Sequence, residues 1–285
     1  MSRVWAPVAW FAAGGVAALA AERLWRDGRG GLGAREIARA LRHGEFQLRY
    51  QPVVDLATVR WMGVECLLRR RTARNVLVGP DAFMPAAIEA GMLEPLTARV
   101  FELIGRDILP LLRQRPDLHA AVNVPPEVMG SAYLAEVARA CGFADYIEQL
   151  VIEIVQTGIL DERGRRAIAT ARALNARIAI DDFGLGANSL AQLQDLEVDF
   201  IKIDKGFVGR IGSESPAAKL VDAIVAIARQ LGVATIAEGV ETTAQADYLR
   251  VLGVEYAQGF LFSRPIGARE LVACLLRNGE ISLTT

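Results

Sequence analysis

The chain has 285 residues, of which 52% are hydrophobic and 23% are charged, with a formal net charge of −1. This balance is typical of a globular protein, excludes a disordered chain, and gives no electrostatic basis for binding DNA or RNA duplexes. The three cysteines form no CxxC pair, which favours a reducing compartment. With only two histidines in the chain, any metal is expected to bind through oxygen ligands.

Residues 1–33 are predicted to form a membrane anchor and a linker. Val4 to Ala21 is an uncharged run of 18 residues, the lower limit for a spanning helix, and four arginines follow it between positions 23 and 35. By the positive-inside rule, the remainder of the chain lies in the cytoplasm, behind a single pass through the inner membrane. A signal peptide cleaved after the Ala-Leu-Ala at residues 18–20 is the alternative. The anchor is favoured because the basic flank follows the apolar run. The glycine-rich residues 27–33 are typical of a flexible linker.

From residue 34 onward, strand-like and helical segments alternate. A helical segment at 34–43 precedes two strand-like runs, at 45–54 and 62–69, which predict a hairpin. The remaining predicted strands cover residues 119–124, 150–154, 177–181, 200–203, 233–237 and 255–260. The remaining predicted helices cover residues 81–90, 93–112, 126–140, 162–174, 216–231, 242–252 and 268–276. Eight strands separated by helices over about 250 residues predict a TIM-like (β/α)8 barrel in residues 34–285, with an open doubly wound sheet as the alternative.

Seven of the apolar runs end in a polar or charged side chain that is expensive to bury without a partner. These side chains are Glu65, Asn123, Glu153, the pair Asp181 and Asp182, Lys202, Glu238, and Gln258. In a barrel, the carboxyl ends of the parallel strands meet at one mouth, where catalytic groups gather. An open sheet would not need a polar group on nearly every strand. The pattern therefore favours the barrel and predicts one shared site.

The predicted site has the chemistry of a metal-dependent phosphodiesterase. Carboxylate and carboxamide oxygens are the ligands that Mg²⁺ and Mn²⁺ prefer, and two such ions commonly assist phosphodiester cleavage. Lys202 could offset phosphate charge, and Glu238 could position or deprotonate a water molecule. Each residue alone has a simpler explanation. A single acid at a strand end is commonly a helix cap or a surface ion pair, and Lys202 could pair with Asp204.

Eight sequence motifs occur in the order and at the spacing of a known family: YQPVVDL, ECLLR, AVNVPP, EIVQ, DDFG, IKIDKGFV, AEGVET and QGFLFSRP. Through them, roughly residues 37–276 resemble the EAL domain family of bacterial cyclic-di-GMP phosphodiesterases. Cys66 stands where the family's name-giving motif has alanine. The resemblance implies a barrel with an antiparallel first strand, hydrolysis of cyclic-di-GMP to linear pGpG with two Mg²⁺ or Mn²⁺ ions, and a homodimer.

The resemblance also implies roles for individual residues. The first metal would be bound by Glu65, Asn123, Glu153 and Asp181, and Asp181 and Asp182 would hold the second. Lys202 and Glu238 would act on the phosphate and the attacking water, with support from Gln258. The dinucleotide would be contacted by Gln51, Leu67 and Arg69.

The sequence departs from the family pattern around the loop that follows the Asp pair. Gln156 replaces a glutamate that steadies this loop, and Leu185, Ala187 and Asn188 replace other family residues. Loss of a carboxylate removes charge-assisted hydrogen bonds, and a loosened loop could misplace the second metal. Two functions are therefore expected to compete. One is hydrolysis. The other is binding of cyclic-di-GMP or a partner protein by a catalytically weak or inactive domain.

Overall fold

A computed structural model describes residues 33–155, 162–183, 197–212 and 216–277 of the chain. Within them, eight strands close into a barrel in the order β1-β2-β4-β5-β6-β7-β8-β9, and β9 pairs with β1. The ring consists of β1 (Phe46–Asp55), β2 (Trp61–Arg71), β4 (His119–Asn123), β5 (Leu150–Val155), β6 (Arg177–Phe183), β7 (Phe200–Ile203), β8 (Ala234–Ala237) and β9 (Tyr256–Ala257). The predicted barrel is confirmed, and the open sheet is excluded.

The first strand runs antiparallel to both of its neighbours, whereas the other strands of the ring pair in parallel. β1 and β2 form the predicted hairpin, in which Gln51 lies directly opposite Glu65. A short strand, β3 (Leu77–Val78), extends β2 outside the ring and was not predicted.

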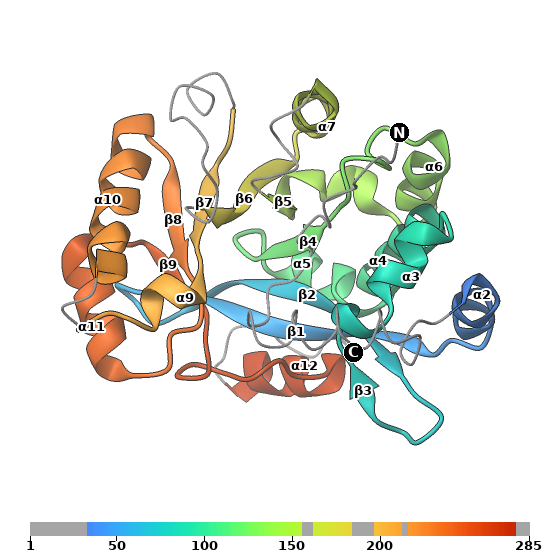
Figure 1. Ribbon diagram of the computed structural model, residues 1–285, viewed down its shortest axis with the longest axis horizontal. Coiled ribbons are helices and arrows are strands. Elements are labelled where there is room, and N and C mark those ends of the chain that lie inside the picture. Colours follow the sequence, from blue (N-terminus) through green and yellow to red (C-terminus); the bar gives the residue numbers. More distant parts are fainter. Residues whose placement is uncertain (1–32, 156–161, 184–196, 213–215, 278–285) are drawn as a thin grey trace, which may run out of the picture.

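Helices cover the outside of the barrel, with α10 and α11 on one flank and α4 and α6 on the other (Figure 1). The longer helices are α2 (Ala34–Arg42), α4 (Leu93–Asp107), α6 (Ala132–Ala140), α7 (Glu162–Ala173), α10 (Pro216–Leu231), α11 (Thr243–Leu252) and α12 (Ala268–Arg277). The shorter ones are α3 (Met84–Glu89), α5 (Leu109–Gln114), α9 (Lys205–Val208), and the 3₁₀ turns η1 (Pro80–Ala82), η2 (Phe143–Asp145) and η3 (Ile147–Gln149).

Three predicted helices have different bounds in the structure. The helix expected at 81–90 is the 3₁₀ turn η1 followed by the shorter helix α3. The segment 93–112 is two helices, α4 and α5, because Pro110 lacks the amide hydrogen that a continuous helix needs and sits instead in the first turn of α5. The helix expected from residue 126 begins at Ala132, where the Ser131 hydroxyl accepts a hydrogen bond from the Leu134 amide and caps it.

The barrel interior has an apolar layer and a charged layer. Small or flat side chains fill the first: Ala121, Val151, Ala179 and the partly buried Phe200. The larger core lies between the strands and the surrounding helices. Further along the same strands, toward their carboxyl ends, lie ionisable side chains that are almost fully buried. The fold therefore concentrates buried charge at one end of the barrel.

The predicted membrane anchor, residues 4–21, lies outside the described residues. Among the described helices, none is both long enough and apolar enough to cross a membrane.

Candidate functional site

Lys202 is the centre of the charged layer. Its ammonium nitrogen lies 2.7 Å from Glu238 Oε1 and 3.0 Å from Glu153 Oε1. Asp181 Oδ1 and Glu65 Oε1 are 3.3 and 3.7 Å away. Lys202 is 1% exposed, so these contacts are made out of reach of bulk water. Because all four carboxylate oxygens lie within 3.7 Å of the Lys202 nitrogen, no two of these oxygens can be farther apart than twice that distance. The predicted convergence of β2, β5, β6 and β8 on one point is confirmed.

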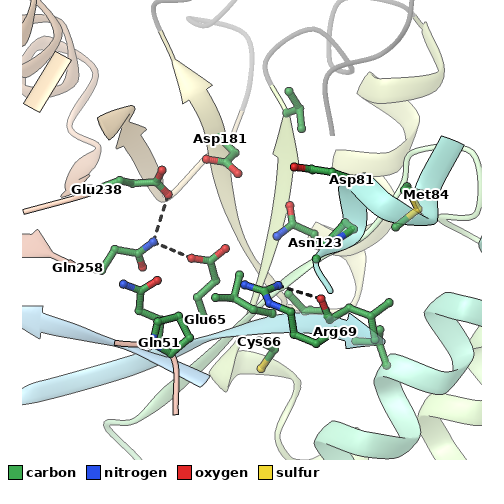
Figure 2. A pocket seen from close by; sticks show the side chains of 18 of the residues that line it. Gln51, Glu65, Cys66, Arg69, Asp81, Met84, Asn123, Asp181, Glu238 and Gln258 are labelled. Atoms are coloured by element: carbon green, nitrogen blue, oxygen red, sulfur yellow. Dashed lines mark hydrogen bonds between the residues drawn. The ribbon is translucent and has the colours of Figure 1, made fainter. Parts of the chain in front are cut away.

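Two carboxamides complete this cluster. The Gln258 side-chain nitrogen donates hydrogen bonds to Glu65 Oε2 at 2.6 Å and to Glu238 Oε1 at 3.2 Å (Figure 2). Asn123, on the strand beside β5, donates to Glu153 Oε2 at 2.9 Å. Both amides act as donors here, so they orient the carboxylates rather than adding negative charge.

The Asp pair lies at a break in the pairing between β6 and β7. The register shifts between Ile180 and Phe183, and Asp182 adopts a left-handed conformation with φ of 56°. Aspartate tolerates this conformation better than most residues, and strain of this kind is common at functional sites. The Asp182 amide donates to Asp181 Oδ1 at 2.9 Å, which helps to hold the first carboxylate toward Lys202. The shift allows adjacent carboxylates to line one pocket.

Glycines let the loops after β8 and β9 approach their neighbours. Gly239 has φ of +67°, and a Cβ there would collide with the Lys205 side chain. A Cβ on Gly259 would overlap the Val240 backbone, so only glycine fits directly after Gln258.

Asp204 caps α9 by accepting a hydrogen bond from the Gly206 amide at 2.7 Å. The alternative partner of Lys202, Asp204, forms no ion pair with it among the contacts of Lys202 with described residues.

A pocket with a volume of about 560 Å³ opens above the cluster. Nine of the predicted site residues line it: Gln51, Glu65, Leu67, Arg69, Asn123, Asp181, Asp182, Glu238 and Gln258. Figure 2 shows several of these side chains around the cavity. The alternation of strand β2 places Glu65, Leu67 and Arg69 on the pocket side. Glu153 and Lys202 do not belong to the lining and are buried behind it.

Burial dominates the acid–base behaviour of this site. It raises the pKa of Asp182 to about 7, with help from Asp181, and the pKa of Glu238 to about 8, against the opposing effect of Lys202. It also raises the pKa of Glu153 well above its usual value. Burial alone would lower the pKa of Lys202, but the surrounding carboxylates, led by Asp181, raise it well above normal. Lys202 is therefore a fixed positive charge, outnumbered by acids.

The donor set fits a hard divalent cation in its chemistry. Four carboxyl groups surround one ammonium, and Asp182 adds a fifth, so with all of them ionised the cluster would carry an excess of negative charge that cations would offset. The geometry is less complete. Among the described residues, no three His, Cys, Asp or Glu side chains are grouped so that they could hold an ion, because the carboxylates turn toward Lys202 instead.

Several pocket residues were not predicted from the sequence. Asp81, Lys205 and Phe260 line the cavity. Lys205 and Phe260 lie in the motifs IKIDKGFV and QGFLFSRP, within three residues of the predicted Lys202 and Gln258, whereas Asp81 lies in none of the motifs. Asp81 follows a glycine-proline turn, and nothing in its sequence context distinguished it. The substituted residues Gln156, Leu185, Ala187 and Asn188 lie outside the described residues.

Comparisons with known proteins agree with this geometry. The sequence profile of the EAL domain matches residues 34–265. The probable cyclic di-GMP phosphodiesterases PdeN and PdeD of Escherichia coli K12 are 36% and 35% identical over 85% and 83% of this chain. These matches cover 47% and 44% of the two relatives, so the chain spans about half the length of the curated relatives it matches.

Among solved structures, the PaMucR phosphodiesterase in complex with c-di-GMP superposes with a TM-score of 0.76 at 32% identity. The match covers 83% of this chain and 98% of that one. Sequence profile, relatives and fold agree over the same region, and this chain belongs to the EAL domain family.

Proposed function

We propose that this barrel hydrolyses cyclic-di-GMP to linear pGpG and so lowers cyclic-di-GMP signalling. The observation that carries the proposal is the buried Lys202 cluster, in which four carboxylates from separate strands meet beside a pocket. The names of the relatives and of the superposed complex support this substrate.

In this proposal, Glu65, Asn123, Glu153 and Asp181 hold one divalent ion, and Asp181 and Asp182 hold a second. Mg²⁺ or Mn²⁺, when bound, would supply positive charge to the scissile phosphate and lower the pKa of a water molecule. The excess of carboxylates over ammonium groups supports this assignment.

The protein's own groups have separate tasks. Glu238 accepts the proton of the attacking water, since burial brings its pKa close to neutral, where a general base is most effective. Lys202 keeps its charge and offsets the phosphate. Gln258 fixes Glu238 and Glu65 in one orientation through its two hydrogen bonds. On the pocket wall, Gln51, Leu67 and Arg69 contact the dinucleotide.

A receptor with little turnover is the second candidate. It is favoured by one observation: the carboxylates turn toward Lys202, and none of the described acidic groups is arranged around a shared ion position. The replacement of the loop-steadying glutamate by Gln156 points the same way. The hydrolase remains the better explanation, because a receptor has no need for Lys202 and Glu238 together.

A turnover assay separates the two candidates. The purified chain is incubated with cyclic-di-GMP and Mg²⁺, then with Mn²⁺, and pGpG is measured by chromatography. Accumulation of pGpG is expected. If the wild type forms no pGpG and a Gln156→Glu and Leu185→Thr double variant does, the wild-type domain is a receptor rather than a hydrolase. Loss of binding in Glu65→Ala is expected under both functions and does not discriminate.

The cellular setting is also a proposal. The apolar run at residues 4–21 and the arginines after it support a single-pass anchor in the inner membrane, with the barrel in the cytoplasm. The family resemblance supports a homodimer. Membrane fractionation of the whole chain and light scattering of the detergent-solubilised protein test these two assignments.

A further inference from the structure

Asp81 contributes a carboxylate to the pocket wall that the proposed reaction does not use. It lies in η1, after the short strand β3, and is half-buried. Figure 2 shows its side chain among the pocket residues, near Asn123 and on the other side of the cavity from Gln258. Asp81 therefore lies apart from the Lys202 cluster but lines the same cavity.

Asp81 has no evident structural task. The turn that contains it has no side-chain cap. Among described residues, no other side chain forms a hydrogen bond or an ion pair within 4 Å with its carboxylate, although the more distant charges of Arg69 and Lys205 act on it. Burial is the largest influence on this group and outweighs the hydrogen bond from its own backbone amide and the charges of both cations, so the pKa of Asp81 is raised. A partly desolvated acceptor with spare capacity is stabilised when a ligand supplies donors.

Arg69 supplies the complementary half of the same wall. Its Nη1 donates to the Leu68 carbonyl at 2.8 Å, which uses one of the five N–H donors of the guanidinium and fixes its direction. Burial lowers the pKa of Arg69, while Glu65 and Asp81 oppose that effect. The wall therefore offers directed donors from Arg69 and acceptors from Asp81.

Guanine presents the matching pattern. Its O6 and N7 accept hydrogen bonds, and its N1–H and 2-amino group donate them. A carboxylate can accept from N1–H and the 2-amino group at once, while a guanidinium can donate to O6 and N7. Adenine lacks both the N1 hydrogen and the 2-amino group, and its 6-amino group would face Arg69. A site built this way discriminates because the wrong base leaves the polar groups of the wall unpaired.

We propose that Asp81 is a specificity-determining residue that accepts hydrogen bonds from the N1–H and 2-amino groups of one guanine of the dinucleotide, while Arg69 donates to O6 and N7 on the adjoining edge of that base. This inference rests on the proposed function for the identity of the ligand, but it does not require turnover.

The test compares cyclic-di-GMP with cyclic-di-IMP, whose hypoxanthine bases lack only the 2-amino group. Affinities are measured by isothermal titration calorimetry in the full-length Glu238→Gln protein, so that the nucleotide is not consumed, with and without Asp81→Ala or Asp81→Asn. With Asp81 present, cyclic-di-GMP is expected to bind at least tenfold more tightly than cyclic-di-IMP. Either Asp81 substitution should reduce this ratio at least fivefold, since a specific base contact is worth about 5- to 150-fold.

The matched control is Glu241→Gln, which changes another carboxylate of the pocket lining without altering the proposed guanine contact. It should leave the ratio unchanged. Asp81→Asn keeps the shape of the side chain and gives a result even where Asp81→Ala does not fold. A ratio that stays the same in both Asp81 variants overturns the inference. If cyclic-di-GMP binds but the wild type makes no pGpG, hydrolysis fails while the Asp81 assignment is still decided by the ratio. If cyclic-di-GMP does not bind at all, both fail.

Discussion

The two ends of the barrel treat charged groups differently. At the amino end, before β4, Arg115 forms two hydrogen bonds of 2.7 Å with Asp117 and a third with the Trp61 carbonyl. Also at this end, Glu255 accepts from the amide and the hydroxyl of Thr235. At the carboxyl end, the single ammonium of Lys202 faces four buried carboxylates.

This difference separates groups that stabilise the fold from groups that serve the site. Charges at the amino end are matched with partners of suitable geometry, so they hold loops against the strands. Charges at the carboxyl end are unequal in number, and burying unequal charge costs stability unless a ligand offsets it. Variants at the two ends are therefore expected to affect different quantities.

Glu238→Gln should have the largest effect, and on turnover alone. The amide keeps the size of the side chain but cannot accept the proton of water, so pGpG formation should fall by about 100- to 10,000-fold. Binding of cyclic-di-GMP should remain within a few-fold of the wild type. Steady-state rates and calorimetry measure the two quantities. Wild-type turnover in this variant would remove Glu238 from its assigned role.

Gly259→Ala should have the second-largest effect on turnover, because it displaces a residue of the site without replacing one. The new methyl group would overlap the Val240 backbone and displace the adjoining Gln258, which orients two carboxylates. A shift of about 1 Å can cost about 100-fold in rate. Turnover should fall by that order while the fold persists, as judged by circular dichroism. A fully active variant would show that the position of Gln258 is unimportant.

Arg115→Gln tests the amino end. The substitution removes the buried guanidinium and with it the charge-assisted hydrogen bonds to Asp117. The free energy of unfolding should fall by about 2 kcal/mol. Turnover per folded molecule should not change, because Arg115 is not one of the residues that line the pocket. Denaturant unfolding and rate measurements on the same sample check this pair of expectations. A loss of rate without a loss of stability would reverse the assignment of the two ends.

The smallest expected effect is a pH dependence of that stability difference. The hydrogen bond from Arg115 holds the pKa of Asp117 below its usual value. A lowered pKa contributes stability above the unfolded value of about 4, and this contribution is lost as pH falls through the folded pKa. The difference between wild type and Arg115→Gln should therefore be constant near pH 7 and shrink below about pH 4. A difference that grows on acidification would contradict the pairing.

The sequence was sufficient to predict which strands converge. Glu65, Glu153, Asp181 and Glu238 each end or follow an apolar run, and that pattern alone indicated buried acids at one edge of a sheet. The β1–β2 hairpin was likewise visible in two strand-length runs separated by a turn. These features are local in sequence, so periodicity detects them.

Other features depend on contacts between distant segments. The strand-end position of Lys202 placed it in the shared site, but its pairing with four carboxylates could not be read from its motif, where Asp204 was the nearest acid. Asp81 was missed because its place in the pocket depends on how η1 packs beside β2. The break at Pro110 was local and could have been predicted, since an interior proline interrupts the hydrogen bonding of a helix.

Thermal unfolding with and without divalent ions shows directly whether the Lys202 cluster binds metal. If the excess of carboxylates around Lys202 is a metal site, saturating Mn²⁺ or Mg²⁺ should raise the Tm of the wild type over its value in EDTA. An ion at 100 times its Kd adds about 2.7 kcal/mol, or about 5–10 °C for a domain of this size. Arg115→Gln should keep this shift and Glu153→Gln should lose most of it. A wild-type Tm that responds to neither ion would show that the Lys202 cluster is not a metal site.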